Sequence, residues 1–291
     1  MRLIIAIPTT GRREIVAGTV RAIARQTRLP DLVLVVVARD TDIDPAALDD
    51  LPFPARIEHS QLGLTRQRNL ALEQVMPDDL LLFLDDDFLM ADDYLAELEK
   101  LFLDQADIVM ATGTVLLDGI HGPGISLDAA TAALLGPAAG QRRLVPVYNG
   151  YGCNMAVRGG PVVQLELRFD VALPLYGWLE DVDFSRRLSV AGRVVRSDAL
   201  RGVHLGTKTG RVNGLRLGYS QIANPLYLMR KGSMHAARAL RIMASNLAKN
   251  LLRSPWPEAG IDRRGRLKGN FRAFADLLRG QLRPERAAEL E

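Results

Sequence analysis

The chain of 291 residues is 48% hydrophobic and 24% charged, which excludes a disordered protein and allows a large core. The formal net charge of +3 hides an uneven distribution, because residues 1–200 carry a net charge of −9 and residues 201–291 a net charge of +12. A single cysteine, Cys153, excludes an internal disulfide and a zinc site built from cysteines. An acidic body followed by a basic region is therefore the first property that a function must explain.

The apolar runs and the N-terminus predict a soluble, cytoplasmic protein. The apolar stretch at residues 3–7 is too short for a signal peptide, and no small-residue cleavage site follows it. The longest apolar runs, 32–38 and 80–84, are far shorter than the roughly 20 residues that span a bilayer.

Expected strands and helices alternate over the first half of the chain. Most of the strands are continuous apolar runs, as in strands buried on both faces. This alternation predicts an α/β fold with a Rossmann-like, mostly parallel sheet flanked by helices, and ligands bind at the carboxyl ends of such strands. The expected strands are 3–7, 32–38, 56–59, 80–84 and 107–117, the expected helices are 14–26, 65–75 and 92–103, and 40–54 is a loop with a short helix.

The second half of the chain is patterned differently. Residues 118–146 are rich in Gly, Ala and Pro and predict a mobile loop, whereas 180–191 predicts a helix that Gly192 ends. From residue 215 onward the chain is helical and basic. We therefore expect a body at 1–214 and a helical, basic C-terminal extension at 215–291.

Three consecutive aspartates, Asp85, Asp86 and Asp87, follow the expected strand 80–84. Carboxylates this close repel one another, so their pKa values rise unless a cation compensates. Mg²⁺ typically uses one or two carboxylates together with substrate phosphates. The alternative is an acidic helix N-terminus, the role expected of Asp92 and Asp93 just downstream. The position directly after a buried strand favours the metal site.

A second acidic cluster, formed by Glu180, Asp181 and Asp183, occupies the first turn of an expected helix. Such acids compensate the helix dipole, and the helix N-terminus would also keep them ionised, as a general base requires. His204 follows the run 193–203. A lone histidine is more often structural than a ligand, so its interest depends on the two acidic clusters.

Together, these motifs resemble family-two glycosyltransferases, which are inverting nucleotide-sugar enzymes of the GT-A fold. The resemblance covers residues 3–210, and its strength lies in the order of the motifs rather than in any single one. The D-x-D motif is at 84–87, and the acidic motif that holds the base is at 180–183. The other segments are 5–12, 26–36, 63–69 and 149–156, followed by His204.

The resemblance implies a donor site for a nucleotide-diphospho-sugar. Asp87, His204 and Asp85 would hold Mn²⁺ or Mg²⁺. Two residues, Ala38 and Arg39, separate Asp40 from the second strand, so that Asp42 is a second candidate for contact with the base. Lys208 and Arg211 are candidates for pyrophosphate contacts, and the alternative for both is solvated loop charge. The donor-binding candidates are Pro8, Thr9, Arg12, Asp40, Arg68, Asp85 and Asp86.

The resemblance also implies an acceptor side. Asp181, with Glu180 beside it, would take the proton of the acceptor hydroxyl, and Gly152, Asn154 and Trp178 would lie near the sugar and the acceptor. The Q-x-x-R-W motif of processive relatives is missing from the sequence, which predicts the transfer of one sugar per encounter. The implied enzyme is a hexosyl- or deoxyhexosyltransferase acting on a glycan or lipid-linked acceptor in cell-surface polysaccharide or glycolipid synthesis.

Two other function classes fit parts of the pattern. A phosphohydrolase would use Asp85 as its nucleophile, but such enzymes want Thr or Val where Leu89 stands, and they place this strand first in the domain. A catalytically inactive nucleotide-sugar-binding module would keep the fold without the chemistry. The presence of Asp87, Asp181 and His204 argues against that module.

The basic extension predicts an amphipathic helix over residues 233–253, and residues 263–268 add a basic cluster. One interpretation is a helix packed on the body with a solvated basic face. The other is attraction of residues 233–268 to an anionic membrane, at the inner face of the cell membrane. Nucleic acid is not expected, because aromatic residues make up only 5% of the chain and no recognition motif is visible. The apolar face comprises Ala236, Leu240, Met243, Ala244, Leu247 and Leu251, and the basic face Arg238, Arg241, Lys249 and Arg253.

Overall fold

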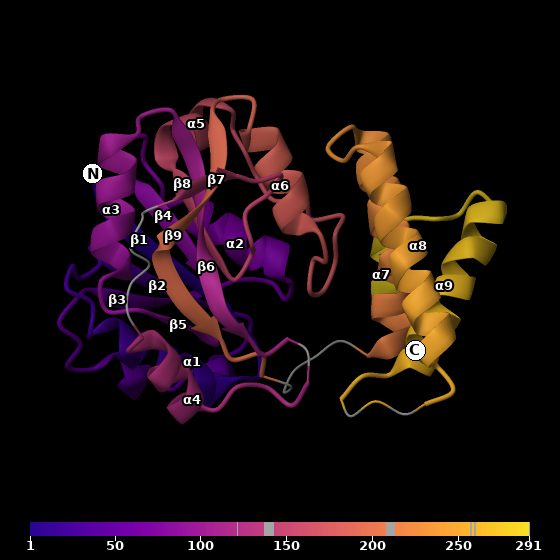
Figure 1. The fold of residues 1–291 in the computed structure, drawn as a ribbon, viewed down its shortest axis with the longest axis horizontal. Coiled ribbons are helices and arrows are strands. Elements are labelled where there is room, and N and C mark those ends of the chain that lie inside the picture. Colours follow the sequence, from indigo (N-terminus) through magenta and orange to yellow (C-terminus); the bar gives the residue numbers. More distant parts are fainter. Residues whose placement is uncertain (121, 137–142, 208–212, 257, 259, 291) are drawn as a thin grey trace.

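The computed structural model describes residues 1–120, 122–136, 143–207, 213–256, 258 and 260–290. Within these residues, nine strands form one sheet that carries helices on both faces, and three long helices stand beside it (Figure 1). The predicted α/β fold is confirmed. The strands are β1 (Leu3–Thr9), β2 (Leu32–Val37), β3 (Ala55–His59), β4 (Leu80–Leu84), β5 (Phe88–Met90), β6 (Ile108–Asp118), β7 (Leu144–Pro146), β8 (Asn154–Arg158) and β9 (Arg193–His204).

The helices cover the sheet and then continue into the extension. The helices are α1 (Arg13–Ile23), α2 (Leu64–Leu72), α3 (Tyr94–Asp104), α4 (Leu127–Leu134), α5 (Gly159–Gln164), α6 (Glu180–Leu188), α7 (Gly214–Lys231), α8 (Ala236–Arg253) and α9 (Arg263–Leu278), with short 3-10 helices at Asp40–Asp42, Pro45–Leu48 and Pro284–Glu289.

The parallel part of the sheet consists of β3, β2, β1 and β4, in that order. Alternate side chains of β1 point to opposite faces of the sheet. Ile5 packs with α1 and α3 on one face, and Ile4 packs with α2 and α6 on the other. Both faces of β1, β2 and β4 are therefore shielded from water, which is why these three strands are almost entirely apolar, whereas β3 at the sheet edge contains Arg56, Glu58 and His59 and is partly exposed. The carboxyl ends of β1, β2 and β4 meet at one edge of the sheet.

Antiparallel β8 inserts between β4 and β6, so that Asn154 lies opposite Leu84 at the end of β4. The long strand β9 then runs parallel to β6 and antiparallel to β5. At the end of β9, His204 is in register with Asp118 of β6 and with Phe88 of β5. This half of the sheet therefore brings His204 to the edge where β4 ends.

One local expectation from the sequence was wrong, and another holds only in part. Residues 118–146 are not only a loop, since α4 and β7 lie there, and Ser126 caps α4 by accepting a hydrogen bond from the N–H of Ala129 at 3.3 Å. The alanine-rich α4 shows little apolar periodicity, yet it buries Ala130 against Val203. Asp92 and Asp93 do lie at the start of α3, as expected, and Asp93 occupies its N-cap position. Neither side chain caps the helix, because Asp93 makes no side-chain cap hydrogen bond and Asp92 pairs with Arg25 at 2.9 Å.

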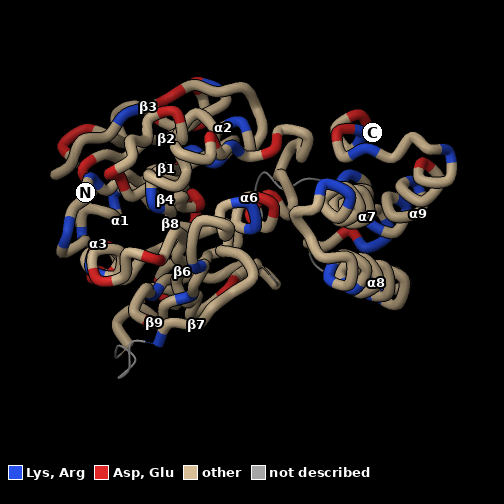
Figure 2. The backbone as a smooth tube through the Cα atoms, turned by 90° about the horizontal axis from the view of Figure 1, so that it is seen from above, with Lys and Arg blue, Asp and Glu red and all other residues tan. Residues whose placement is uncertain are grey.

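Helices α7, α8 and α9 share a core of their own. Where α7 crosses α9, a Cβ atom at Gly218 would lie 2.0 Å from the carbonyl oxygen of Arg266, so only glycine permits this contact. A buried amide network joins the three helices: Nδ2 of Asn250 donates to Gln221 at 2.8 Å and to Asn270 at 2.9 Å. Lys and Arg outnumber Asp and Glu on α7 and α8 (Figure 2).

The extension is also tied to the body. Leu228 of α7 packs with Val182 of α6, and the buried Asn224 donates a hydrogen bond to the carbonyl of Trp178 at 2.7 Å. Helix α7 thus supports the segment that precedes α6. The division of the chain at residue 214 stays a prediction.

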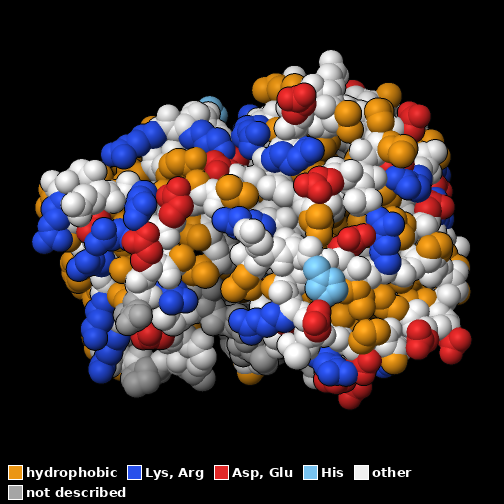
Figure 3. All heavy atoms as spheres, turned by 180° about the vertical axis from the view of Figure 1, so that it is seen from behind, with side chains coloured by type: hydrophobic (Ala, Val, Ile, Leu, Met, Phe, Trp, Pro, Cys, Tyr) orange, Lys and Arg blue, Asp and Glu red, His pale blue; other side chains and the backbone are white. Residues whose placement is uncertain are grey.

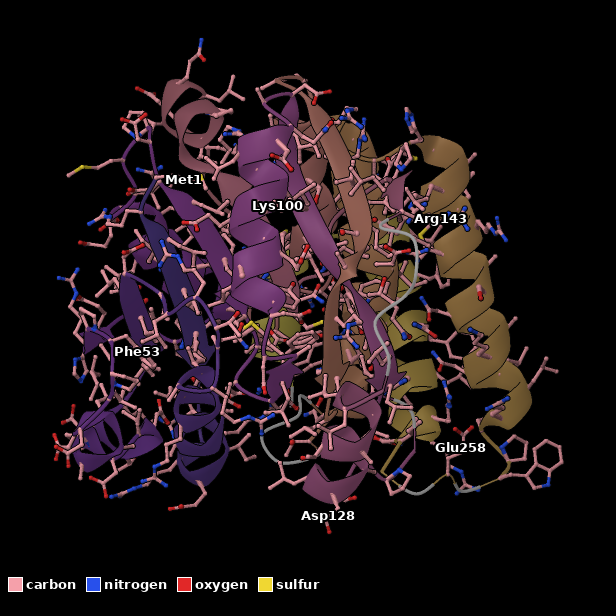
Figure 4. All side chains as sticks on the ribbon, turned by 60° about the vertical axis from the view of Figure 1, so that its left-hand side comes forward. Met1, Phe53, Lys100, Asp128, Arg143 and Glu258 are labelled. Atoms are coloured by element: carbon pink, nitrogen blue, oxygen red, sulfur yellow. The ribbon has the colours of Figure 1, made fainter. Side chains whose placement is uncertain are left out.

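The burial of α8 differs from the expected packing of its apolar face. The buried residues are Ala239, Met243 and Asn250, whereas Leu240 and Leu251 are each 55% exposed. Figure 4 shows α8 at the edge of the molecule, with Glu258 beyond its C-terminal end. The packed side is therefore a narrow strip of small and amide side chains, and most of the expected apolar face is in solvent.

Among the described residues, no helix combines the length and apolar character needed to cross a bilayer.

Candidate active site

The aspartates that follow β4 lie at the carboxyl edge of the parallel sheet, as the sequence predicted. The carboxylate of Asp86 accepts a hydrogen bond from Thr9 Oγ1 at 2.6 Å and another from Arg12 Nη1 at 2.8 Å. Burial and the neighbouring Asp87 raise the pKa of Asp86 to about 6, although Arg12 opposes the shift. Asp86 is thus a buried carboxylate held against the end of β1 rather than an open ligand.

Asp85, Asp87 and His204 form a second group around the same turn. The Nε2 atom of His204 lies 3.3 Å from Asp87 Oδ1 and 3.9 Å from Asp85 Oδ2. The other ring nitrogen, Nδ1, is 2.9 Å from Asp118 Oδ1 at the end of β6. Burial alone would lower the pKa of His204, but Asp118 and Asp87 outweigh it and raise that pKa to about 10. The imidazole is therefore protonated at neutral pH when no cation competes for Nε2.

These three side chains fit a divalent cation. One ligand atom from each of Asp85, Asp87 and His204 lies within 4.8 Å of the other two. The buried Asp87 Oδ1 faces His204 Nε2 at 3.3 Å without a hydrogen bond of good geometry, so a cation could take the place of the proton between these two atoms. Two carboxylates and an imidazole suit Mg²⁺ or Mn²⁺. Asp118 would fix the ring through Nδ1, as outer carboxylates commonly do for histidine ligands.

The loops after β1 and β2 are joined by Asp42. Its buried carboxylate accepts hydrogen bonds from the N–H groups of Gly11, Ala38 and Arg39 at 2.8–3.0 Å. Asp40, the other candidate for contact with the base, has a side chain that is 96% exposed and lies 2.9 Å from His59 Nε2. Asp42 is thus committed to the backbone, whereas Asp40 is accessible.

The end of β1 forms the buried base of the site beside the β4 aspartates. Pro8 and Thr9 are both buried, and the side-chain amide of Gln67 donates to the carbonyls of Thr9 and Val36, each at 2.8 Å. The Gln67 side chain therefore links the ends of β1 and β2 through these two hydrogen bonds.

Arg68 of α2 connects the β4 aspartates to the acids of α6. Its guanidinium, 1% exposed, lies 2.5 Å from Glu180 Oε1 and 3.3 Å from Asp85 Oδ1. It also donates to the carbonyl of Gly152 at 2.8 Å, where a Cβ atom would lie 3.1 Å from Glu180 Oε1. Burial raises the pKa of Glu180 despite Arg68. Glu180 is therefore held inside the protein, with Oε2 lacking a partner among the described residues.

Asp181 is the more accessible acid of α6. It is half-buried and accepts hydrogen bonds from the N–H of Val182 at 2.8 Å and from Asn149 Nδ2 at 3.4 Å. Burial raises the pKa of Asp181 although Arg68 lowers it. A carboxylate with a raised pKa and two neutral donors is a suitable general base.

The segment before Asp181 has an unusual backbone. Leu175, Gly177 and Leu179 have φ values of 59°, 63° and 74°, in the left-handed region that costs a non-glycine residue about 1–2 kcal/mol. Asn224 of α7 holds Trp178 within this segment. Such strain persists where the surroundings over-determine the backbone, often at functional sites. The loop thus sets where α6 begins and where Asp181 points.

The remaining predicted residues fall at different depths. Gly152 and the half-buried Trp178 line the junction of β8 and α6, whereas Asn154 is completely buried and pairs with Thr112. Cys153 is buried too, and burial together with nearby Asp85 raises the pKa of its thiol. Lys208 and Arg211 lie outside the described residues, so their pyrophosphate contacts stay predictions.

Three residues around the site were not predicted from the sequence to belong to it. Asp118 and Tyr151 support His204, since the hydroxyl of Tyr151 donates to Asp118 Oδ2 at 2.8 Å. Gln67 clamps the strand ends. Asp118 stands at the end of a predicted strand, which is a usable signal in a parallel sheet. Tyr151 and Gln67 carry no comparable signal, because long-range pairing decides their contacts.

Comparison with known families confirms the resemblance. Residues 4–126 match the model of glycosyl transferase family 2. The match includes the β4 aspartates and Arg68 but ends before α6 and His204. No curated protein matches the chain.

Solved structures similar to this chain extend the comparison over its full length. S. aureus TarS 1–349 in complex with UDP-GlcNAc is 14% identical with a TM-score of 0.54, over 97% of this chain and 93% of that one. The mannosyltransferase PcManGT from Pyrobaculum calidifontis, in complex with GDP-Man and Mn²⁺, is 16% identical with a TM-score of 0.55, over 99% and 84%. GalNAc-T7 with UDP, GalNAc and Mn²⁺ is 13% identical with a TM-score of 0.53, over 80% and 51%. At such identities the likeness shows the fold, which is GT-A. This chain spans 42% of a longer TarS structure.

Proposed function

We propose that this family-two glycosyltransferase moves one sugar from a nucleotide-diphospho-sugar to a hydroxyl acceptor with inversion of the anomeric carbon. The single observation that carries the proposal is Arg68, whose guanidinium contacts both Asp85 of the cation-binding group and Glu180 beside Asp181. One buried side chain thus joins a group suited to a diphosphate and a cation to a group suited to a base. A hexosyl or deoxyhexosyl donor and a glycan or lipid-linked acceptor of the cell surface complete the proposal.

The donor side would bind the nucleotide and stabilise the leaving group. Pro8, Thr9 and Asp40 flank the proposed base pocket, and Arg12 and Asp86 lie beside the proposed phosphate position. Asp85, Asp87 and His204 would hold Mn²⁺ or Mg²⁺, which stabilises the negative charge of the departing diphosphate when it is bound.

The acceptor side would supply the base. Asp181 takes the proton of the acceptor hydroxyl while the oxygen attacks the anomeric carbon from the face opposite the diphosphate. One carbon–oxygen bond forms as the carbon–oxygen bond to phosphate breaks, so a single displacement inverts the centre. Asn149 and the N–H of Val182 orient the Asp181 carboxylate, and its raised pKa makes it a stronger base than a free aspartate.

A thermal-shift screen of nucleoside diphosphates with and without Mn²⁺ tests the donor side. A nucleotide at about 100 times its Kd stabilises a protein by about 2.7 kcal/mol. We expect one nucleotide to stabilise the protein only with the metal, and the matching nucleotide sugar to be consumed. Proton NMR of the product then reports the anomeric configuration, and retention would contradict a single displacement.

The same assays separate the two other function classes. Release of phosphate from a simple aryl phosphate, without use of a nucleotide sugar, would favour a phosphohydrolase that uses Asp85. Metal-dependent nucleotide binding without turnover of any nucleotide sugar would favour an inactive binding module.

We further propose that the extension lies against an anionic membrane surface, at the inner face of the cell membrane. Leu240, Leu247 and Leu251 form an apolar stripe along α8, with two of the three more than half exposed, and residues 263–268 add basic charge nearby. Lys and Arg are prominent over the extension when the molecule is seen from behind (Figure 3). Co-sedimentation with phosphatidylglycerol vesicles should be lost in Leu240→Ser/Leu251→Ser, and unchanged sedimentation would contradict the proposal.

A further inference from the structure

A shallow, open groove of about 600 Å³ runs along one side of α8, and the residues that line it all belong to this helix. Its polar lining comprises Arg238, Arg241, Ser245, Asn246 and Lys249. The cations at its two ends are eleven positions apart in the helix, or about 16 Å at a rise of about 1.5 Å per residue. The segment 232–257 contains no Asp or Glu, so the helix itself offers these cations no counter-charge.

The cations of this groove have no carboxylate partner among the residues that the structure describes. Arg241 and Lys249 make no described ion pair, and Arg238 lies over the ring of Tyr148, 4.2 Å from its centroid. Arg186 of α6 approaches the same ring, at 4.7 Å. By contrast, Arg12 and Arg68 in the body each pair with acids. The three cations of the groove and Arg186 beside it thus have no carboxylate partner among the described residues, and such an arrangement attracts anions.

The groove leads to the proposed base. Nη2 of Arg238 donates to Asn149 Oδ1 at 3.3 Å, and Nδ2 of the same amide donates to Asp181 Oδ2 at 3.4 Å. Only the Asn149 side chain therefore separates the first cation of the groove from Asp181. An anion in the groove would lie beside a hydroxyl that is positioned for deprotonation.

The membrane surface does not account for these cations. Lys249 lies on the opposite side of α8 from Leu240, because nine residues span two and a half turns. If the apolar stripe of α8 lay in a bilayer surface, the side chain of Lys249 would therefore point away from the lipid. The groove cations instead continue toward Tyr148 and Asn149 of the body.

From these observations, and resting on the proposed function, we infer that the groove lined by Arg238, Arg241 and Lys249 binds a phosphate group of the acceptor. Phosphate is the expected anion because Arg and Lys bind its several charged oxygens through charge-assisted hydrogen bonds. The length of the groove suits an acceptor whose phosphate is some distance from the reacting hydroxyl. This acceptor is either a phosphodiester-containing glycan or an isoprenoid diphosphate-linked sugar, which share this chemistry.

Binding of two phosphate probes to Arg241→Gln/Lys249→Gln tests the inference. The probes are a soluble glycerol phosphate oligomer and farnesyl diphosphate, titrated by calorimetry in EDTA so that cation-dependent binding at the β4 aspartates is silent. The matched control, Arg230→Gln/Arg279→Gln, removes two exposed cations elsewhere on the extension. We expect the groove variant to bind about tenfold more weakly than the wild type, through loss of two solvent-exposed charge contacts, and the control to bind normally.

Each outcome has a definite meaning. Preference for the oligomer or for the diphosphate identifies the source of the phosphate. The inference is overturned if neither probe binds, if both double variants lose affinity equally, or if an oligogalacturonate binds in the groove better than either phosphate. Stabilisation by a nucleoside diphosphate with Mn²⁺ is measured in parallel on all variants. If neither the wild type nor any variant is stabilised by the nucleotide, the proposed function is rejected. If nucleotide stabilisation persists but phosphate binding does not differ between the groove variant and the control, only the groove is rejected.

Discussion

At the donor end of the site, formed by Asp85, Asp86, Asp87 and His204, each buried carboxylate has a cationic side chain beside it. At the base end, Asp181 has only neutral hydrogen-bond donors in direct contact among the described residues, and Arg68, whose charge opposes the rise in the pKa of Asp181 on burial, is paired with Glu180. The first arrangement balances the carboxylate charges with nearby cations when no metal ion and diphosphate are bound. The second leaves one carboxylate with a raised pKa, ready to accept a proton. One sheet edge thus supports two electrostatic environments, and Arg68 is their only direct link within the described structure.

Asp181→Asn breaks the base end alone and has the largest expected effect. The amide cannot accept the acceptor proton, so we expect kcat to fall by about 10²–10⁴-fold. Nucleotide stabilisation with Mn²⁺ should stay at the wild-type value. Initial rates and thermal shifts measure the two quantities, and Asp128→Asn on the exposed start of α4 is the matched control. Unchanged transfer would remove Asp181 from the reaction.

Arg68→Met removes the link between the two ends. Glu180 would be left buried without its counter-charge, and breaking a buried pair in this way costs about 3–5 kcal/mol. Chemical denaturation measures the loss in the free energy of unfolding. The double variant Arg68→Met/Glu180→Gln should recover part of that loss, because it removes the orphaned charge as well. If the double variant is less stable than Arg68→Met, the pair does not have the role assigned to it.

Asp87→Asn breaks the donor end. The variant should lose the metal-dependent part of nucleotide stabilisation, about 2.7 kcal/mol at a nucleotide concentration about 100 times the Kd. Isothermal titration with Mn²⁺ and the nucleotide checks this directly. Asp118→Asn gives a finer comparison. It keeps Asp87 as a ligand but weakens the hydrogen bond that orients His204, so it should reduce the affinity for Mn²⁺ less than Asp87→Asn does. Equal losses would contradict the division between ligand and support.

His204 makes the donor end sensitive to pH. Its pKa is raised from 6.5 in the unfolded chain to about 10 in the folded protein, so the folded state binds the proton more tightly. The resulting stabilisation is complete below pH 6.5 and is lost as the pH rises toward 10. Denaturation across this range should show a steeper loss of stability in the wild type than in His204→Asn. Mn²⁺ should bind more tightly over the same range, because it competes with that proton.

The sequence predicted the donor end better than the base end for a physical reason. Parallel strands that are apolar throughout place their carboxyl ends at one edge, so the positions of Asp85–Asp87 followed from pattern alone. Arg68, Glu180 and Asp181 come together only because antiparallel β8 inserts beside β4 and α7 holds the segment before α6. Neither the position of β8 nor the contact from α7 can be predicted from the periodicity of the sequence.

Helix α8 shows the same limit more sharply. Its periodicity correctly predicted an apolar side and a basic side, but the packed side is a third one, bearing Ala239, Met243 and Asn250. The amide network of Asn250 with Gln221 and Asn270 decides this choice. Buried amides of this kind are indistinguishable in sequence from surface ones.

The burial of Cys153 has a practical consequence for experiments on this molecule. A thiol that is 2% exposed and has a raised pKa is almost entirely in the unreactive, protonated form at neutral pH. Maleimide dyes should therefore ignore the native protein. A cysteine introduced at Ser245 would be the single labelled position in an otherwise unaltered chain. Fluorescence from that label would then report when the groove along α8 is filled, before any substrate has been identified.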